Sequence, residues 1–121
     1  MKTCLIVDDS RVMRKVASRI MDKLGFSIAE AEDGAQAFTY CEKQFPDFIL
    51  LDWYMPIMNG IEFLGQLRAL PGGDKPVVVF CTTENEMGRI QQAMAAGANE
   101  YLMKPFDEEI LATKLQQVGM L

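Results

Sequence analysis

The feature that most limits how this chain can fold is the alternation of short apolar runs with segments of helical periodicity. The apolar runs occupy 4–7, 27–31, 48–51, 77–81 and 101–103. Apolar residues follow helical spacing over 13–24, 34–41, 60–67, 84–96 and 107–118. Five strand–helix units in succession predict an α/β protein with a parallel sheet, helices on both faces and right-handed crossovers.

Residues at the ends of these segments agree with that prediction. Gly25 and Gly97 follow helical segments and are suitable helix stops, and Pro46 requires the second helix to end before it. Asp107 is suited to cap a last helix. The residues of that helix that we expect to face the core are Ile110, Leu111, Leu115 and Val118.

Charged residues stand directly after three of the predicted strands. Asp8 and Asp9 follow the first, Asp52 ends the third and Lys104 follows the fifth. In a parallel sheet all of these ends lie on one edge, which is where α/β proteins bind ligands. Three crowded carboxylates repel one another, and one lysine is too few to balance them. The pattern therefore implies a divalent cation, and oxygen-only ligands favour Mg²⁺.

Composition removes several classes of function. The 121 residues fit a single domain, half of them are hydrophobic, and the net charge of −5 argues against unaided nucleic-acid binding. The chain has no histidine, which excludes zinc–histidine sites and Ser-His-Asp catalysis. No secretory signal or transmembrane stretch is visible, so we expect a cytoplasmic protein without membrane contact. The three cysteines, Cys4, Cys41 and Cys81, are expected to be reduced and mostly buried.

Half of the basic residues lie in the first 23 positions: Lys2, Arg11, Arg14, Lys15, Arg19 and Lys23. This cluster is either a solvated helix face or a docking face for an acidic partner.

Several motifs together resemble the receiver domain of two-component response regulators, over essentially the whole chain. They are Asp8-Asp9, Glu32-Asp33-Gly34, the run from Asp52 to Gly60, Thr82, Ala95-Ala96-Gly97-Ala98 and Lys104-Pro105-Phe106. The form is nearest to the stand-alone chemotaxis type. The resemblance implies a flavodoxin-like sheet in the order 2-1-3-4-5, which is taken over from the family and not worked out from the residues. It also implies that 1–121 is one receiver domain with no output domain.

The resemblance assigns a role to each residue at the predicted edge. Asp52 would accept a phosphoryl group from the phosphohistidine of a kinase or a histidine phosphotransfer protein. Mg²⁺ would be held by Asp8, Asp9, Asp52 and the backbone carbonyl of Tyr54. The remaining phosphoryl contacts would come from Lys104, the Thr82 hydroxyl and the Thr83 backbone N–H. Such a chain is a phosphoacceptor, not an enzyme, and at most catalyses its own phosphotransfer and dephosphorylation.

The resemblance also implies a switch and a readout surface. Thr82 would move toward the phosphoryl group and Tyr101 would rotate into the vacated space. A downstream protein would then bind the face formed by 84–118, in chemotaxis or another phosphorelay. Tyr54 and Glu84 would flank the path of the hydrolytic water, and the bulk of Tyr54 leads us to expect slow dephosphorylation.

The residues are also compatible with three other interpretations. The first is a receiver-like scaffold that binds partners without phosphorylation, against which the intact acids, Thr82 and Lys104 argue. The second is a flavodoxin-like electron carrier, which needs a Ser/Thr/Gly-rich phosphate loop where this chain has Asp8-Asp9-Ser10-Arg11. The third is a metal-dependent phosphatase, which usually has a second acid where Tyr54 stands.

Overall fold

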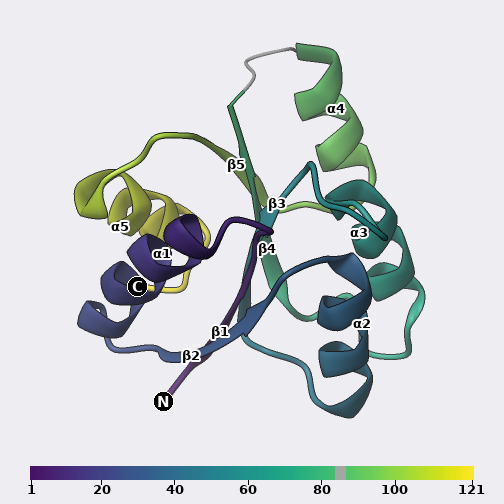
Figure 1. Cartoon of the computed structure of the whole chain (residues 1–121), viewed down its shortest axis with the longest axis horizontal. Coiled ribbons are helices and arrows are strands. Elements are labelled where there is room, and N and C mark those ends of the chain that lie inside the picture. Colours follow the sequence, from purple (N-terminus) through teal and green to yellow (C-terminus); the bar gives the residue numbers. More distant parts are fainter. Residues whose placement is uncertain (84–86) are drawn as a thin grey trace.

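The computed structural model describes residues 1–83 and 87–121, and strands alternate with helices throughout (Figure 1). The strands are β1 (Thr3–Val7), β2 (Ser27–Ala31), β3 (Phe48–Asp52), β4 (Val77–Thr82) and β5 (Glu100–Met103). The helices are α1 (Arg11–Lys23), α2 (Gly34–Lys43), α3 (Gly60–Ala69), α4 (Met87–Ala95) and α5 (Glu108–Gln117). The βα alternation predicted from the sequence is confirmed.

The strands form one parallel sheet in the order β2-β1-β3-β4-β5. Helices α1 and α5 cover one face, and α2, α3 and α4 cover the other (Figure 1). Both the layers and the strand order agree with the expectation. Because β1, β3 and β4 lie between other strands and under helices on both sides, their residues are almost all buried.

The sheet separates two hydrophobic clusters. Leu5, Ile49 and Leu51 contribute to the cluster under α2, α3 and α4, whereas Ile6 and Leu50 contribute to the one under α1 and α5. Adjacent residues of a strand point to opposite faces, so continuous apolar runs such as 48–51 supply both clusters. Cys4, Cys41 and Cys81 are free and buried in these clusters, as predicted.

Side-chain caps fix where four of the helices begin. Each capping oxygen accepts a hydrogen bond from a backbone N–H of the first turn, and the caps are Ser10, Asp33, Asn59 and Asp107. The predicted cap at Asp107 is therefore confirmed. Asn59 and Glu62 form a reciprocal capping box, which places the start of α3 firmly after the end of β3.

Two of the helices differ in detail from the prediction. The expectation that Ile110 faces the core is wrong, since Ile110 is 45% exposed while Leu111 and Leu115 are fully buried. Successive helical residues are rotated by about 100°, so Ile110 turns away from the sheet once Leu111 faces it. The fourth helix was expected over 84–96; its described part is Met87–Ala95, and residues 84–86 lie outside the described residues. Gly97, with φ of 111°, ends it as predicted.

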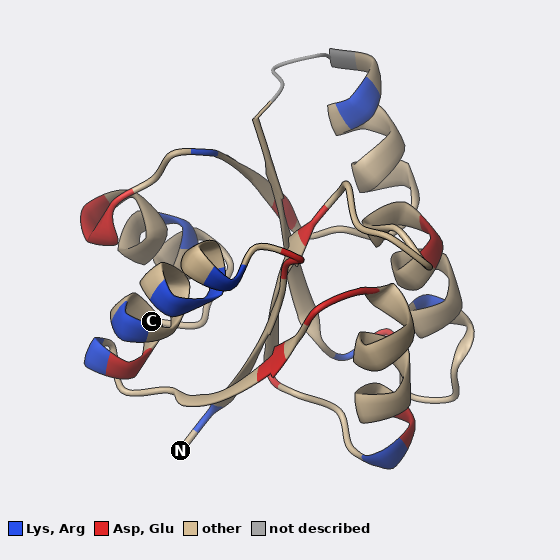
Figure 2. Ribbon diagram, viewed as in Figure 1, with Lys and Arg blue, Asp and Glu red and all other residues tan. Residues whose placement is uncertain are grey.

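Helix α1 carries a marked concentration of positive charge, whereas acidic residues mark the strand ends at the centre of the molecule (Figure 2). Among the described residues, no helix is long enough and apolar enough to cross a membrane.

Candidate functional site

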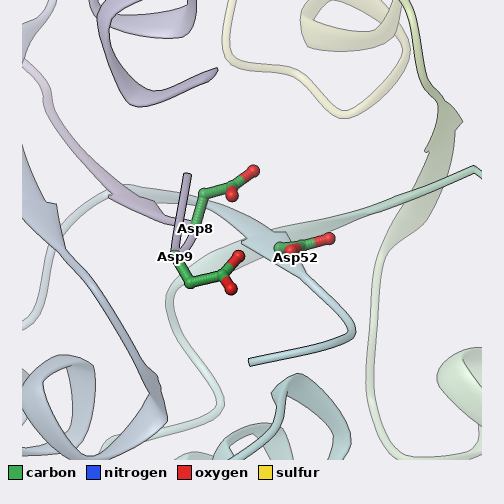
Figure 3. A group of neighbouring side chains, drawn as sticks. All are labelled: Asp8, Asp9 and Asp52. Carbon is green, nitrogen blue, oxygen red and sulfur yellow. The ribbon is translucent and has the colours of Figure 1, made fainter. Parts of the chain in front are cut away.

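Three carboxylates meet at the carboxyl-terminal edge of the sheet. Asp8 and Asp9 follow β1, and Asp52 ends the neighbouring strand β3 (Figure 3). One oxygen from each lies within 4.8 Å of the others. Asp8 is buried, Asp52 is partly buried and Asp9 is exposed, so the cluster opens to solvent on one side. The convergence predicted from the strand ends is confirmed.

Lys104 enters this cluster from the loop after β5 and joins two of the acids. Its Nζ lies 2.8 Å from Asp8 Oδ2 and 3.0 Å from Asp52 Oδ1. The sequence predicts that Lys104 lies at the same edge as the acids, and its contacts with both Asp8 and Asp52 are findings of the structure. Burial opposes the charge of Lys104, but hydrogen bonds and attraction from the two carboxylates outweigh it and raise its pKa. The ammonium group therefore stays protonated.

The Asp52 carboxyl group occupies a less favourable environment than a solvated acid. Burial raises its pKa and Asp8 raises it further, while Lys104 and a backbone hydrogen bond from Trp53 lower it; the net direction is upward. The Asp52 carboxylate is thus partly desolvated, and the nearby positive charge of Lys104 does not fully compensate for the lost hydration. A cation bound beside it would relieve that deficit.

The residues present fit a hard divalent cation. Every ligand atom in the cluster is a carboxylate oxygen, and the 4.8 Å grouping lets all three acids approach one ion. Asp8 Oδ1 accepts a hydrogen bond from the Ser10 backbone N–H at 2.9 Å, and Oδ2 accepts one from Lys104. Both Asp8 oxygens are therefore engaged, which favours contact with the ion through water. A contribution from the Tyr54 carbonyl stays a prediction.

Two glycines hold the segment that follows Asp52. Gly60 donates its backbone N–H to the Trp53 carbonyl at 2.9 Å, and a Cβ at this position would collide with the Asp52 carbonyl oxygen. Gly34 donates to the Met58 carbonyl at 2.9 Å, and a Cβ there would approach that oxygen to 2.6 Å. Both glycines belong to motifs that carry the resemblance, and close backbone approach is the physical reason for them.

Arg14, on α1, contacts the backbone of Asp8. The sequence pattern does not indicate this supporting role of Arg14. Its Nη1 donates to the Asp8 carbonyl oxygen at 2.7 Å, and its Nε lies 3.0 Å from Glu30 Oε1. The sequence includes Arg14 in the basic cluster as a surface or docking residue, but the structure buries it. Its position four residues after the Ser10 cap, on the inner side of α1, is a signal that could have separated it from Arg11 and Lys15.

The residues predicted to form the switch, Thr82 and Tyr101, lie on neighbouring strands. Thr82 ends β4 and is buried, and its carbonyl accepts the Lys104 backbone N–H at 2.8 Å. Thr82 and Tyr101 both line a cavity of about 10 Å³ between α4 and the sheet. Thr83, at the strand end, is exposed. Tyr101 is partly buried, and the Lys114 ammonium of α5 lies 5.1 Å from its ring centroid.

Tyr54 is half exposed and leans against α4. The guanidinium carbon of Arg89 lies 4.8 Å from the Tyr54 ring centroid and 5.7 Å from that of Trp53. The other predicted turnover residue, Glu84, lies outside the described residues. Arg89 was not singled out from the sequence, because no motif there links it to a residue 35 positions earlier.

Comparison with known proteins identifies the family. Residues 4–116 match the model of the response regulator receiver domain. The chain is 35% identical over 116 residues to a chemotaxis protein CheY homolog of Campylobacter jejuni, covering 94% of this chain and 89% of that protein. It is 36% identical to the chemotaxis protein CheY of Pseudomonas aeruginosa, covering 94% and 93%. The structure of the chemotaxis response regulator CheY4 of Vibrio cholerae superposes with a TM-score of 0.92 at 34% identity, covering 98% of each chain.

Proposed function

This chain belongs to the response regulator receiver domain family, and we propose on that basis that it is a phosphoryl-accepting signalling protein with Asp52 as the acceptor. The observation that carries the proposal is the bridge from Lys104 to Asp8 and Asp52 beside an open cluster of three carboxylates. This arrangement brings together a carboxylate nucleophile, a positive charge and oxygen ligands. The chain acts as a stoichiometric acceptor in this proposal and not as an enzyme.

The proposed reaction transfers a phosphoryl group from a phosphohistidine of a kinase or a histidine phosphotransfer protein. An oxygen of Asp52 attacks phosphorus, the P–N bond to the donor breaks, and the imidazole leaves with the electron pair. Lys104 exchanges its Asp52 oxygen for a phosphoryl oxygen, while the Thr82 hydroxyl and Thr83 N–H donate to the others.

Mg²⁺ held by Asp8, Asp9 and Asp52, with the Tyr54 carbonyl, would screen repulsion between the carboxylate and the phosphoryl oxygens. Asp9 is suited to direct contact because its side chain lies on the exposed side of the cluster. Asp8 keeps its bonds to Ser10 and Lys104 and would reach the ion through water.

Output is proposed to leave through the face formed by 84–118. The shared cavity of Thr82 and Tyr101 supports this, since inward movement of either side chain changes the surface between α4 and β5. The related proteins are named as chemotaxis proteins, which favours a chemotaxis-type pathway in the cytoplasm. Free, buried cysteines fit that reducing compartment.

Phosphorylation by a small acyl phosphate tests the proposal without the natural donor. With Mg²⁺ present, intact-mass spectrometry should show one added phosphoryl group on the wild type and none on Asp52→Asn. Lys104→Ala should still fold but lose the structural response, because phosphoryl charge would then lack its partner. A phosphoryl group mapped to another residue in the wild type would sink the assignment.

A further inference from the structure

The guanidinium group of Arg89 stacks on two aromatic rings that directly follow the proposed acceptor. Its Cζ lies 4.8 Å from the Tyr54 ring centroid and 5.7 Å from the Trp53 ring centroid. Trp53 is buried and packs in turn on Phe80, with centroids 5.0 Å apart. A cation within about 6 Å of an aromatic face is attracted by the negative charge of that face.

This stack joins two segments that the sheet does not hold together. Trp53 and Tyr54 belong to the loop after β3, whereas Arg89 lies in the first turn of α4. Arg89 and Trp53 also line the cavity of about 10 Å³ that contains Thr82 and Tyr101. Arg89 thus lies between the loop that carries the acceptor and the helix of the proposed output face.

We propose that Arg89 is a positioning residue that holds the Tyr54 ring beside Asp52 and so slows loss of the phosphoryl group. The inference rests on the proposed function. In the hydrolytic step, a water oxygen attacks phosphorus, the bond from phosphorus to Asp52 breaks, and the carboxylate leaves with the electron pair. The water's proton passes to solvent and inorganic phosphate is released.

The attacking water must approach opposite the Asp52 oxygen. Tyr54 is two residues from Asp52, and half of its surface is exposed, so the ring is free to change rotamer unless something restrains it. Arg89 supplies that restraint from α4. A single cation–π contact at a half-exposed position corresponds to a factor of about two to five in the population of the restrained ring.

The first readout needs no phosphorylation. Trp53 is the only tryptophan of the chain, so its emission reports the stack directly. Arg89→Met keeps the length of the side chain and removes its charge, and Arg89→Lys keeps the charge. We expect Arg89→Met to shift the emission maximum of Trp53 and Arg89→Lys to restore it toward the wild-type value. Unchanged emission in Arg89→Met overturns the inference, whether or not Asp52 accepts a phosphoryl group.

The second readout is the decay of phosphoprotein after the small acyl phosphate is removed. Arg89→Met should lose its phosphoryl group about two to five times faster than the wild type, with Arg89→Lys in between. In a Tyr54→Ala background, Arg89→Met should add no further acceleration, because the ring it positions is gone. Equal acceleration in both backgrounds overturns the inference, because the effect of Arg89 then does not depend on the Tyr54 ring.

Failure of the proposed function gives a different pattern. The emission shift can be present although wild-type protein never carries a phosphoryl group on Asp52. In that case the contact of Arg89 with the two rings is supported, but the acceptor assignment and the role of Arg89 in turnover are both refuted. An unchanged or slower decay in Tyr54→Ala, with normal phosphorylation, shows that the ring is not a shield; it overturns the inference about Arg89 and leaves the acceptor assignment intact.

Discussion

At the scale of single residues, the balance of charge around Asp52 decides what the site can do. Asp52 and Asp8 share one ammonium group, that of Lys104, and burial raises the Asp52 pKa above its ordinary value of 3.8. A carboxyl group with a raised pKa in the folded state binds its proton more tightly there than in the unfolded chain. Ionised Asp52 therefore lowers stability when no cation occupies the cluster.

Asp52→Asn should accordingly stabilise the protein without Mg²⁺. The gain should be on the order of 1 kcal/mol at neutral pH, since Lys104 keeps Asp8 as a partner and the amide oxygen can still accept its hydrogen bond. The difference should grow as the pH rises from 3.8 through the raised pKa and stay constant above it. Urea unfolding of both proteins in a chelator, across that pH range, measures it. A less stable Asp52→Asn at pH 7 would show that the Lys104 bond to Asp52 outweighs the cost of burial.

Among the elements, the strands β1, β3, β4 and β5 each bring polar residues of the site to the same edge of the sheet. The register pairs Asp52 with Cys81 on β4 and Thr82 with Met103 on β5, so the end of β4 lies between the acceptor and the Lys104 loop. Thr82 is tied to that loop by its carbonyl, and its side chain shares a cavity with Tyr101. Strand β4 is thus the element that can relay an event at Asp52 to β5 and α4.

Thr82→Ala tests this relay. The variant should accept a phosphoryl group on Asp52 but gain little affinity for its protein target, because the hydroxyl that senses the phosphoryl group is missing. The coupling lost should be on the order of 1–3 kcal/mol, typical of allosteric switches. Affinity for a target captured with phosphorylated wild-type protein gives the measurement, and Thr83→Ala is the matched control because its backbone N–H remains. Equal target affinity of phosphorylated wild type and phosphorylated Thr82→Ala would refute the relay.

In the molecule as a whole, the site lies at the carboxyl-terminal edge of the sheet, between its central strands. An ion bound between the acids would join Asp8 and Asp9, which follow β1, to Asp52 at the end of β3. Those strands also connect the two hydrophobic clusters, so an ion that binds only the folded arrangement stabilises the entire domain.

Addition of Mg²⁺ should therefore raise the free energy of unfolding, by about 2.7 kcal/mol when the ion is at 100 times its dissociation constant. Trp53 emission supplies that constant, and urea unfolding with and without Mg²⁺ supplies the stability. Asp9→Ala should bind the ion more weakly and show a smaller gain at the same concentration. If Mg²⁺ stabilises Asp9→Ala as much as the wild type, the ion does not bind at this cluster.

The helices and strands, and the meeting of the three acids at one edge, follow from local sequence patterns. Apolar periodicity and caps such as Asp107 are local, and the ends of parallel strands share one edge whatever their order. The strand pattern alone therefore predicts that Asp8, Asp9 and Asp52 lie close together. The strand order came with the family resemblance, because periodicity within a segment contains no information about which strand lies beside it.

Contacts between residues far apart in the sequence depend on how the helices and strands pack. Lys104 reaches Asp8 across 96 positions, and Arg89 meets Tyr54 across the space between α4 and the loop after β3. Arg14 is buried against Glu30, although the other basic residues of the same stretch of α1, Arg11, Lys15 and Arg19, are exposed. Long, flexible charged side chains carry no periodic signal for their partner. The distances between packed helices and strand ends select the partner, and those distances exist only once the chain has folded.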